Sequence, residues 1–275
     1  MYTINCNGTL IDLSSPKVMG ILNITPDSFF DGGKYKNESD ILSQTEKMLS
    51  EDATFIDIGA YSSRPGAKHI SEEEELQRIV PVIELLVKNF PEIIISVDTF
   101  RSKVAQETIN SGAAIINDIS GGKMDDNMFA TVAKLQVPYI LMHMLGTPKT
   151  MQNNPEYKDV TKEVISFFAE QINILHQLKV NDIILDVGFG FGKTIEHNFE
   201  LLKNLSLFKS LDAPMLAGVS RKSMLYKTLD TTAQEALNAT TSANTIALLN
   251  GAKILRVHDV KEAVEAVKIV NQISF

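Results

Sequence analysis

Runs of apolar residues recur along the chain and are separated by longer amphipathic stretches. The runs are nearly continuous in Ile, Val and Leu, and do not alternate apolar with polar residues. Strands that are covered on both faces have this pattern, so each run predicts a buried strand. The runs lie at Val18–Asn23, Thr54–Ala60, Ile93–Thr99, Ala114–Ser120, Tyr139–His143, Ile183–Gly188, Pro214–Ser220 and Ile254–Asp259.

The stretches between these runs carry helix signals. Ser71 and Glu74 fit the capping-box pattern and predict a helix that runs to about Asn89. Pro81 lies inside this helix and should kink or shorten it. Gly112 is suited to end another helix at the C′ position. The other helices are expected at Ser39–Glu51, Arg101–Ser111, Glu156–Leu178, Glu196–Ser210, Ala233–Asn250 and Val260–Gln272.

The alternation of eight strands with helices predicts repeated βα units and a parallel sheet. A parallel sheet that closes after eight units is the (β/α)₈ or TIM barrel, an α/β fold. An open doubly wound sheet is the alternative, and eight similar units favour closure. Asn7-Gly8, within Thr3–Leu13, predicts a small β-hairpin that covers the N-terminal end of the barrel. We expect one domain over residues 1–275, with the hairpin in 1–14 and the barrel in 15–275.

Composition narrows the function classes. The chain has 275 residues, of which 26 are basic and 34 acidic, and its net charge of −8 argues against a nucleic-acid binder. The single cysteine, Cys6, excludes an internal disulfide framework and a multi-cysteine zinc site. No apolar run approaches the roughly 18 residues that span a bilayer, and Met1–Leu13 does not read as a signal peptide. A cytoplasmic protein with no membrane partner is expected.

Polar side chains gather where the predicted strands end. In a (β/α)₈ barrel these ends carry the chemistry, and burying so many polar groups without partners would be costly. A polar ligand is therefore expected there. For Asp57, which lies before the end of its strand, a structural role is an equal alternative. The strand-end residues are Asn23, Ser63, Arg64, Asp98, Asn117, His143, Asp186, Ser220, Arg221, Lys222, Arg256 and His258.

The residue types indicate the kind of ligand. The cationic or potentially cationic side chains suit phosphate oxygens. Asp98, Asn117 and Asp186 suit a flat heterocycle, since a carboxylate accepts two parallel N–H bonds and an amide both donates and accepts. The ligand is therefore expected to be a heterocycle that carries a phosphate or diphosphate. The cationic group comprises Arg64, Arg221, Lys222, Arg256 and His258.

Two glycine patterns resemble nucleotide-binding motifs without matching them. Gly192-Lys193-Thr194 resembles the end of a Walker A loop, but Val187 stands where its first glycine belongs. Gly188-x-Gly190 resembles a dinucleotide fingerprint, but Lys193 stands where its third glycine belongs. This loop is expected to bring flexible backbone close to a ligand.

The histidines show no metalloprotease pattern. His258 lies two residues after Arg256, on the same side of the strand, and is the expected functional histidine. His143 is left open between a functional and a packing role. The remaining histidines are expected at the surface or in packing, and the methionines near the fifth strand either line an apolar pocket or pack. These residues are His69, His176, His197, Met142, Met144 and Met151.

The strand-end segments together resemble the dihydropteroate synthase family, the pterin-binding barrel enzymes of folate biosynthesis. The resemblance spans most of the chain in order. It runs through residues 19–29 (MGILNITPDSF), 62–67 (SSRPGA), 96–99 (SVDT), 116–122 (INDISGG), 142–148 (MHMLGTP), 186–193 (DVGFGFGK), 218–223 (GVSRKS) and 256–259 (RVHD).

The resemblance implies a transferase reaction. In this family 6-hydroxymethyl-7,8-dihydropterin diphosphate condenses with p-aminobenzoate, giving 7,8-dihydropteroate and pyrophosphate, with Mg²⁺ accompanying the diphosphate. An SN1-like path is expected, because cations and Mg²⁺ neutralise the leaving group and Asp98 stabilises the pterin cation. A homodimer and sulfonamide binding are implied by the family alone.

The resemblance also implies residue roles. Asp98, Lys222, Asp31 and Arg64 are implied in catalysis. The pterin is implied to contact Asp98, Asn117, Met142, Asp186 and Lys222; the diphosphate Asn23, Arg256 and His258; and p-aminobenzoate Phe29, Ser63, Arg64, Pro65, Phe191, Lys222 and Ser220. Mg²⁺ is implied at Asn23, with Asp31 joining it.

Two segments depart from the family pattern, and two other function classes compete. Tyr61 stands in a loop that usually has a smaller residue, and Val187 replaces the usual proline after the strand-six aspartate. A corrinoid-linked methyltetrahydrofolate methyltransferase shares the barrel but binds no diphosphate, so Arg256 and His258 count against it. A non-catalytic pterin-binding barrel is disfavoured by the complete set of strand-end residues.

Overall fold

Eight parallel strands form a closed barrel in the computed structural model, which describes residues 2–24, 38–62, 69–148, 150–151 and 154–273. Neighbouring strands follow the order β10-β3-β4-β5-β6-β7-β8-β9, so the last strand pairs with the first. This confirms the (β/α)₈ barrel and excludes an open sheet. The strands are β3 (Lys17–Asn23), β4 (Phe55–Gly59), β5 (Ile95–Asp98), β6 (Ile115–Asp118), β7 (Tyr139–Met142), β8 (Ile183–Asp186), β9 (Met215–Ala217) and β10 (Ala252–Val257).

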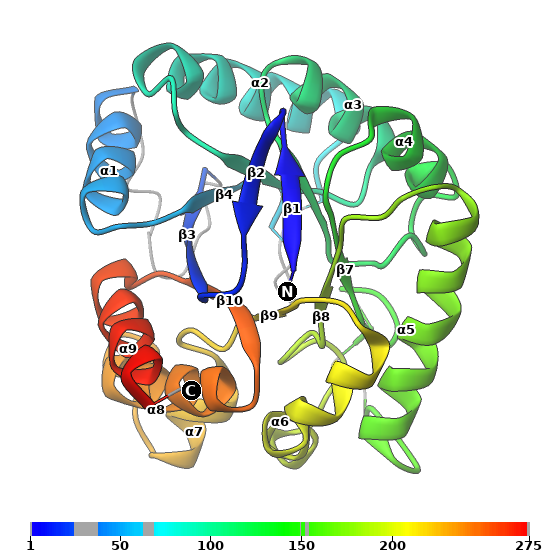
Figure 1. Cartoon of the computed structure of the whole chain (residues 1–275), viewed down its shortest axis with the longest axis vertical. Helices are drawn as coiled ribbons and strands as arrows, with labels where there is room; N and C mark the ends of the chain where they lie inside the picture. Colours follow the sequence, from blue (N-terminus) through cyan, green and yellow to red (C-terminus); the bar gives the residue numbers. More distant parts are fainter. Residues whose placement is uncertain (1, 25–37, 63–68, 149, 152–153, 274–275) are drawn as a thin grey trace.

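Helices surround the barrel (Figure 1). Their buried sides join the outward-facing strand residues in the main hydrophobic core, which explains why the strands are apolar on both faces. The helices are α1 (Glu38–Ser50), α2 (Glu72–Asn89), α3 (Ser102–Asn110), α4 (Met128–Leu135), α5 (Val160–Gln177), α6 (Ile195–Lys203), the 3₁₀ helix η1 (Leu205–Leu211), α7 (Ser223–Thr228), α8 (Leu237–Leu249) and α9 (Val260–Ile273). None of those described has the length and apolar character needed to cross a membrane.

Each predicted strand is confirmed, and the helix predictions need three corrections. Pro81 does not shorten α2, which continues to Asn89, and the Ser71 side chain accepts the Glu74 amide at its start as predicted. The single helix predicted over Glu196–Ser210 is wrong, because α6 ends at Lys203 and a 3₁₀ helix follows. Helices α4 and α7 were not predicted; both are short, so few residues carry a periodic pattern.

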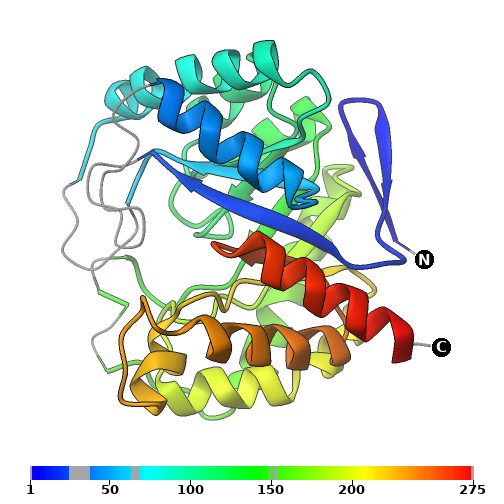
Figure 2. The same ribbon diagram turned by 90° about the vertical axis from the view of Figure 1, so that its left-hand side faces the viewer.

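The predicted hairpin is confirmed by β1 (Thr3–Cys6) and β2 (Thr9–Asp12), which pair antiparallel. Asn7 and Gly8 both have positive φ, of 51° and 87°, as a type I′ turn requires. The hairpin lies across one end of the barrel (Figure 2). Ile4 packs there with the interior residues at the start of the strands, so the hairpin covers the N-terminal end.

Inside the barrel, the layer next to the hairpin is apolar and the following layer is largely polar. The apolar layer contains Met19, Phe55, Ile115, Ile140, Ile184, Leu216 and Ile254. Since side chains alternate along a strand, residues two positions further point into the same interior. Those residues are Ile21, Asp57, Asn117, Met142, Asp186, Gly218 and Arg256. Polar groups are thereby concentrated toward the C-terminal ends of the strands.

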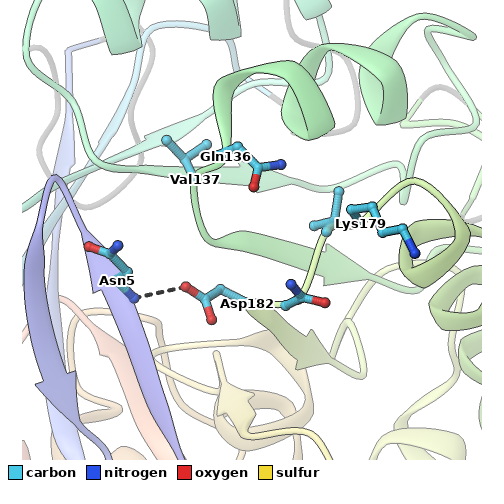
Figure 3. A pocket seen from close by; sticks show the side chains of 7 residues that line it. Asn5, Gln136, Val137, Lys179 and Asp182 are labelled. Carbon is cyan, nitrogen blue, oxygen red and sulfur yellow. Dashed lines mark hydrogen bonds between the residues drawn. The ribbon is translucent and has the colours of Figure 1, made fainter.

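A small pocket of about 240 Å³ lies at the opposite end, where the hairpin meets the turns before β7 and β8 (Figure 3). Its lining includes Asn5, Gln136, Lys179 and Asp182. The Asp182 carboxylate already accepts the backbone N–H of Asn5 at 2.8 Å. This pocket therefore belongs to the attachment of the hairpin and is separate from the polar end of the barrel.

Candidate active site

Arg256 lies at the centre of a charged network inside the barrel. Its Nε donates to Asp57 Oδ2 at 2.6 Å, and its Nη2 donates to Asp98 Oδ2 at 3.0 Å. Asn117 also donates to Asp57 Oδ2, at 3.1 Å. Strands β4, β5, β6 and β10 each contribute one of these residues, so barrel closure is what brings them together.

The network shifts the acidity of its members. Burial raises the pKa of Asp98 to about 7; Arg256 opposes this shift, and Asp57 adds to it. Burial alone would lower the pKa of Arg256, but Asp57 and Asp98 outweigh it and raise that pKa. Arg256 therefore stays cationic, while Asp98 can hold a proton near neutral pH.

Asn23 lies beside Asp98 at the end of its own strand. A Cβ on Gly59 would stand 3.4 Å from Asn23 Oδ1 and 3.6 Å from Asp98 Cβ, so this glycine lies between the two side chains. The Asn23 amide is thus placed at the polar end of the barrel, next to the Arg256 network. Asn23 is partly exposed.

Asp186 and Lys222 form the second charged part of the site. Asp186 Oδ1 accepts the Gly188 backbone N–H at 2.8 Å, which orients the carboxylate. Burial raises the pKa of Asp186, although Lys222 lowers it in part. Burial lowers the pKa of Lys222 to about 8, against the attraction of Asp186. Burial therefore disfavours both the carboxylate form of Asp186 and the ammonium form of Lys222.

Lys222 also meets the loop after β8. Its Nζ donates to the Phe189 carbonyl and lies 4.3 Å from the centroid of the Phe191 ring. Phe191 in turn packs against a buried apolar cluster that includes Met142. The other buried members of this cluster are Phe100, Ile119, Met144 and Met151. The methionines near the fifth strand therefore pack together, with Phe191 on the side of Lys222.

Ser220 and His258 contact each other after β9 and β10. Ser220 Oγ lies 3.0 Å from His258 Nδ1 and accepts the His258 backbone N–H at 3.2 Å. Ser220, itself a predicted site residue, thus fixes the position of His258. His69 and His176 are exposed, and His197 caps α6 by accepting the Thr194 N–H, so these three have the surface or packing roles expected of them.

His143, left open by the sequence, is a buried partner of Lys193. Lys193 Nζ lies 3.0 Å from His143 Nδ1. Burial lowers the pKa of His143 to about 2, and the nearby Lys193 and Lys123 lower it further. Burial lowers the pKa of Lys193 to about 7. His143 is therefore neutral at physiological pH.

Arg221, one of the cations that the sequence suggests for phosphate, has its partners within the protein. Its Nε and Nη2 donate to the two carboxylate oxygens of Asp259, each at 2.8 Å. Its Nη1 donates to the carbonyls of Ala233 and Gln234. These bonds join the segments after β9 and β10 to the start of α8, a structural role.

Five predicted site residues lie outside the described part of the chain. They are Phe29, Asp31, Ser63, Arg64 and Pro65. The unusual Tyr61, just before three of them, is described: its ring meets Phe100 edge-on at 5.0 Å. Its hydroxyl lies 3.2 Å from His69 Nδ1. Val187, the other departure, is fully buried in the main core.

Sequence reasoning leaves Asp57 open between two roles and misses the burial of Lys193. Asp57 binds both Arg256 and Asn117, as its structural role requires. The sequence indicates this pairing only indirectly: Asp57 is a single carboxylate within an apolar strand, and a buried carboxylate needs a partner. Lys193 was considered only as part of a failed nucleotide motif. Nothing in its sequence context shows that its ammonium is buried.

No resident metal site is evident in the part of the chain that the structure describes. There, no group of three or more His, Cys, Asp or Glu side chains could hold an ion. Asn23 offers one amide oxygen at the polar end of the barrel. That fits Mg²⁺, a hard cation that keeps several waters and takes oxygen ligands from substrate phosphates. The donor set suits a cation that arrives with a phosphorylated ligand.

Comparison with known proteins decides the family. Residues 19–258 match the family described as pterin binding enzyme. The chain belongs to this family. The pterin binding enzymes it resembles include the dihydropteroate synthase of Escherichia coli K12, 46% identical over 96% of this chain and 93% of the relative. That of Haemophilus influenzae is 44% identical and covers 96% of both chains.

Solved structures of dihydropteroate synthases have the same fold. The Yersinia pestis enzyme in a sulfonamide drug complex superposes with a TM-score of 0.95 and 43% identity, covering 99% of both chains. The Xanthomonas albilineans enzyme with 4-aminobenzoic acid has a TM-score of 0.90 and 36% identity, covering 98% of this chain and 97% of that chain. Family membership therefore agrees with the barrel and with the polar C-terminal end of its strands, which we call the polar mouth.

Proposed function

We propose that this chain, a dihydropteroate synthase, binds and joins its two substrates at the polar mouth of the barrel. The observation that carries the proposal is that Asp98, Asn117 and Asp186 lie at or next to the ends of three barrel strands, where Asp186 and Asp98 also act on the charge of Lys222. Carboxylates and an amide held inside a barrel can receive the ring N–H groups, exocyclic amine and carbonyl of a dihydropterin. Met142 would contact the apolar face of the ring.

The phosphate end of the substrate is proposed to meet Asn23, Arg256 and His258. Arg256 already uses its Nε and Nη2 on carboxylates, so it is rigidly oriented before any ligand arrives. Asn23 would hold Mg²⁺ together with the diphosphate oxygens, and Asp31 is proposed to join it. When bound, Mg²⁺ neutralises charge on the leaving diphosphate.

The second substrate, p-aminobenzoate, is proposed to lie against Phe191, Lys222 and Ser220. The Phe191 ring offers a flat apolar surface, and the Lys222 ammonium lies over the same ring. The remaining contacts are proposed for Phe29, Ser63, Arg64 and Pro65, of which Arg64 would also take part in catalysis.

The reaction is proposed to follow an SN1-like path. The bond between the pterin methylene carbon and the diphosphate oxygen breaks, and pyrophosphate leaves with the electron pair. The Asp98 carboxylate stabilises the resulting pterin cation. The p-aminobenzoate nitrogen then attacks the methylene carbon, and one of its protons passes to solvent water. Asp98, with its pKa raised to about 7, can carry charge or a proton as the ring changes.

A substrate assay tests this proposal directly. The purified protein is mixed with the dihydropterin diphosphate, p-aminobenzoate and Mg²⁺, and pyrophosphate and dihydropteroate are measured together. Equal amounts of the two products are expected, with no product when Mg²⁺ is chelated. Binding of methyltetrahydrofolate without release of pyrophosphate would favour the methyltransferase alternative. Pterin binding without any turnover would favour a non-catalytic barrel.

The protein is further proposed to be a cytoplasmic, single-domain enzyme, with the hairpin in 1–14 and the barrel in 15–275. The only cysteine, Cys6, is buried and free. A chain without disulfides suits a reducing compartment. The hairpin shares a hydrophobic cluster with the barrel interior, which supports a single folding unit.

A homodimer is proposed through the face of α8 and η1. Helix α8 contains no charged residue, yet Ile246 and Leu249 are 44% and 55% exposed. Leu207 on η1 is 53% exposed. Exposed apolar side chains of this kind favour a symmetric contact with a second copy.

The dimer is tested by light scattering of Leu249→Asp, with Leu10→Asp as the matched control. Leu10 is 71% exposed on strand β2 of the hairpin, which belongs to neither α8 nor η1. A dimeric wild type and control with a monomeric Leu249→Asp variant are expected. A dimer that survives the Leu249 change would reject this face.

A further inference from the structure

The loop after β8, residues 188–193, is held by side chains that donate to its backbone carbonyls. Lys193 Nζ donates to the Gly188 and Phe191 carbonyls at 3.1 and 3.0 Å. The Tyr157 hydroxyl donates to the Gly192 carbonyl at 2.8 Å, and Lys222 donates to the Phe189 carbonyl. The carbonyls of this loop thus have side-chain partners on several elements.

Lys193 also joins this loop to the one after β7. Its Nζ donates to the His143 carbonyl at 3.2 Å, in addition to its contact with His143 Nδ1. The two loops lie in direct contact, since a Cβ on Gly188 would collide with the His143 carbonyl. A Cβ on Gly192 would stand 2.6 Å from the Leu145 carbonyl oxygen. Lys193 therefore occupies the junction of two packed loops.

The chemistry of this junction is unusual for a lysine. Lys193 is only 4% exposed, and its hydrogen-bonding partners are three carbonyl oxygens and a neutral imidazole. An ammonium has three protons, so it can satisfy the three carbonyls. Burying a cation among neutral partners is costly, and an apolar side chain could fill the same volume. Unlike an apolar side chain, the ammonium donates hydrogen bonds that fix the conformation of the loop backbone.

We propose that Lys193 is a positioning residue for the p-aminobenzoate site. By holding the Gly188 and Phe191 carbonyls, it sets the Phe191 ring against the Lys222 ammonium. This inference rests on the proposed placement of p-aminobenzoate against Phe191 and Lys222. Asp98, Asn117 and Asp186 belong to strands β5, β6 and β8. Of the proposed pterin contacts, Asp186 and Lys222 also touch this loop, through one bond each to its backbone, whereas the Phe191 side chain belongs to the loop itself. Loss of the Lys193 donors should therefore act mainly on the second substrate.

The test compares Lys193→Met with wild type in steady-state kinetics. Methionine fills much of the volume but donates no hydrogen bond. The KM for p-aminobenzoate should rise about tenfold, the effect of losing charge-assisted hydrogen bonds. The KM for the pterin diphosphate should change by less than about threefold. A residue that only supports the fold would lower the melting temperature without this split between substrates.

Three further variants make the result decisive. Lys123→Met removes a neighbouring exposed lysine, whose Nζ lies 4.5 Å from the Phe167 centroid, and should leave both KM values unchanged. Tyr157→Phe removes one loop contact without a cavity and should raise the KM for p-aminobenzoate about twofold to fivefold. Phe191→Ala tests the placement of p-aminobenzoate itself and should raise the same KM.

The outcomes separate the inference from the proposed function. If Phe191→Ala leaves the KM for p-aminobenzoate unchanged, the placement of that substrate is wrong. If Phe191→Ala raises it while Lys193→Met and Tyr157→Phe do not, Lys193 is not a positioning residue. Should Lys193→Met fail to fold, Tyr157→Phe alone decides by the same criterion.

Discussion

Arg256 Nη2 donates to Asp98 Oδ2 at 3.0 Å, although the two residues are 158 positions apart in the chain. The same guanidinium binds Asp57, so one cation pairs with two carboxylates inside the barrel. Arg256 therefore stabilises the folded structure at the polar mouth, in addition to its proposed role in binding a ligand there. Asp57 Oδ1 is buried without a hydrogen-bond partner among the described residues, which makes this support more important.

Replacing Arg256 by Gln should destabilise the protein. The change leaves Asp57 and Asp98 without their cation, and breaking a buried pair in this way costs about 3–5 kcal/mol. Urea unfolding at pH 7 measures the loss.

The loss should shrink as the pH falls. Burial already raises the pKa of Asp98 to about 7, and removing Arg256 raises that pKa further. A folded state that binds more protons than the unfolded chain gains stability as pH falls. The deficit of Arg256→Gln relative to wild type should therefore be smaller at pH 5 than at pH 8. An equal deficit at both values would show that repulsion between these carboxylates is not its cause.

Replacing Asp186 by Asn should weaken pterin binding and spare the fold. The amide oxygen can still accept the Gly188 N–H, but the other position then offers a donor in place of an acceptor. The loss should be about 1.5–3 kcal/mol, or roughly tenfold to a hundredfold in affinity. Calorimetry with a dihydropterin analogue that lacks phosphates measures it.

Asp182→Asn is the matched control for this prediction. Asp182 lies just before the same strand, at the hairpin end, and accepts the Asn5 N–H at 2.8 Å. Its change should leave pterin affinity untouched. Equal affinity losses in the two variants would place the effect in strand β8 as a whole and remove Asp186 from the pterin site.

The sequence predicted the barrel well because its signals are local and repeated. Each buried strand carries a continuous apolar run, and the Asn7-Gly8 turn is specified by two adjacent residues. Alternation along each strand then shows which side chains share the interior, as with Arg256 and His258. Helix α4 escaped prediction because it has only eight residues, too few for a clear period.

Pairing between distant residues could not be predicted in the same way. Arg221 and Arg256 both follow barrel strands and have the same chemistry, yet Arg221 binds Asp259 and Arg256 binds Asp57 and Asp98. Which cation meets which carboxylate depends on strand stagger and loop path. The burial of Lys193 among carbonyls depends on loop packing in the same way.

Replacing Ile4 by Ala should destabilise the barrel without changing catalysis. Ile4 is 1% exposed and packs on the apolar layer that closes the N-terminal end. A cavity there should cost about 2–5 kcal/mol. Chemical unfolding measures this loss, and Leu10→Ala, 71% exposed on the same hairpin, should cost less than about 0.5 kcal/mol. A changed KM for either substrate in Ile4→Ala would contradict the separation of the two barrel ends.

The dependence of kcat/KM on pH above neutrality should be set by Lys222. Burial lowers the pKa of this ammonium to about 8; Asp186 opposes the shift, and Arg256 adds to it. The group is thus cationic below about pH 8 and neutral above. If the cation holds substrate, kcat/KM should fall about tenfold per pH unit above that value, since this ratio reports the free enzyme.

Lys222→Arg provides the comparison, because a guanidinium stays charged throughout this range. Its absolute activity should be lower, but the fall near pH 8 should be absent up to about pH 10. Lys193→Met should keep the fall, since burial lowers the pKa of Lys193 to about 7, below the pH at which Lys222 loses its proton, and its proposed role is in the loop. A fall that persists in Lys222→Arg and disappears in Lys193→Met would assign the alkaline limb to Lys193. That result would mean that loop geometry, and not the charge of Lys222, limits substrate capture above neutral pH.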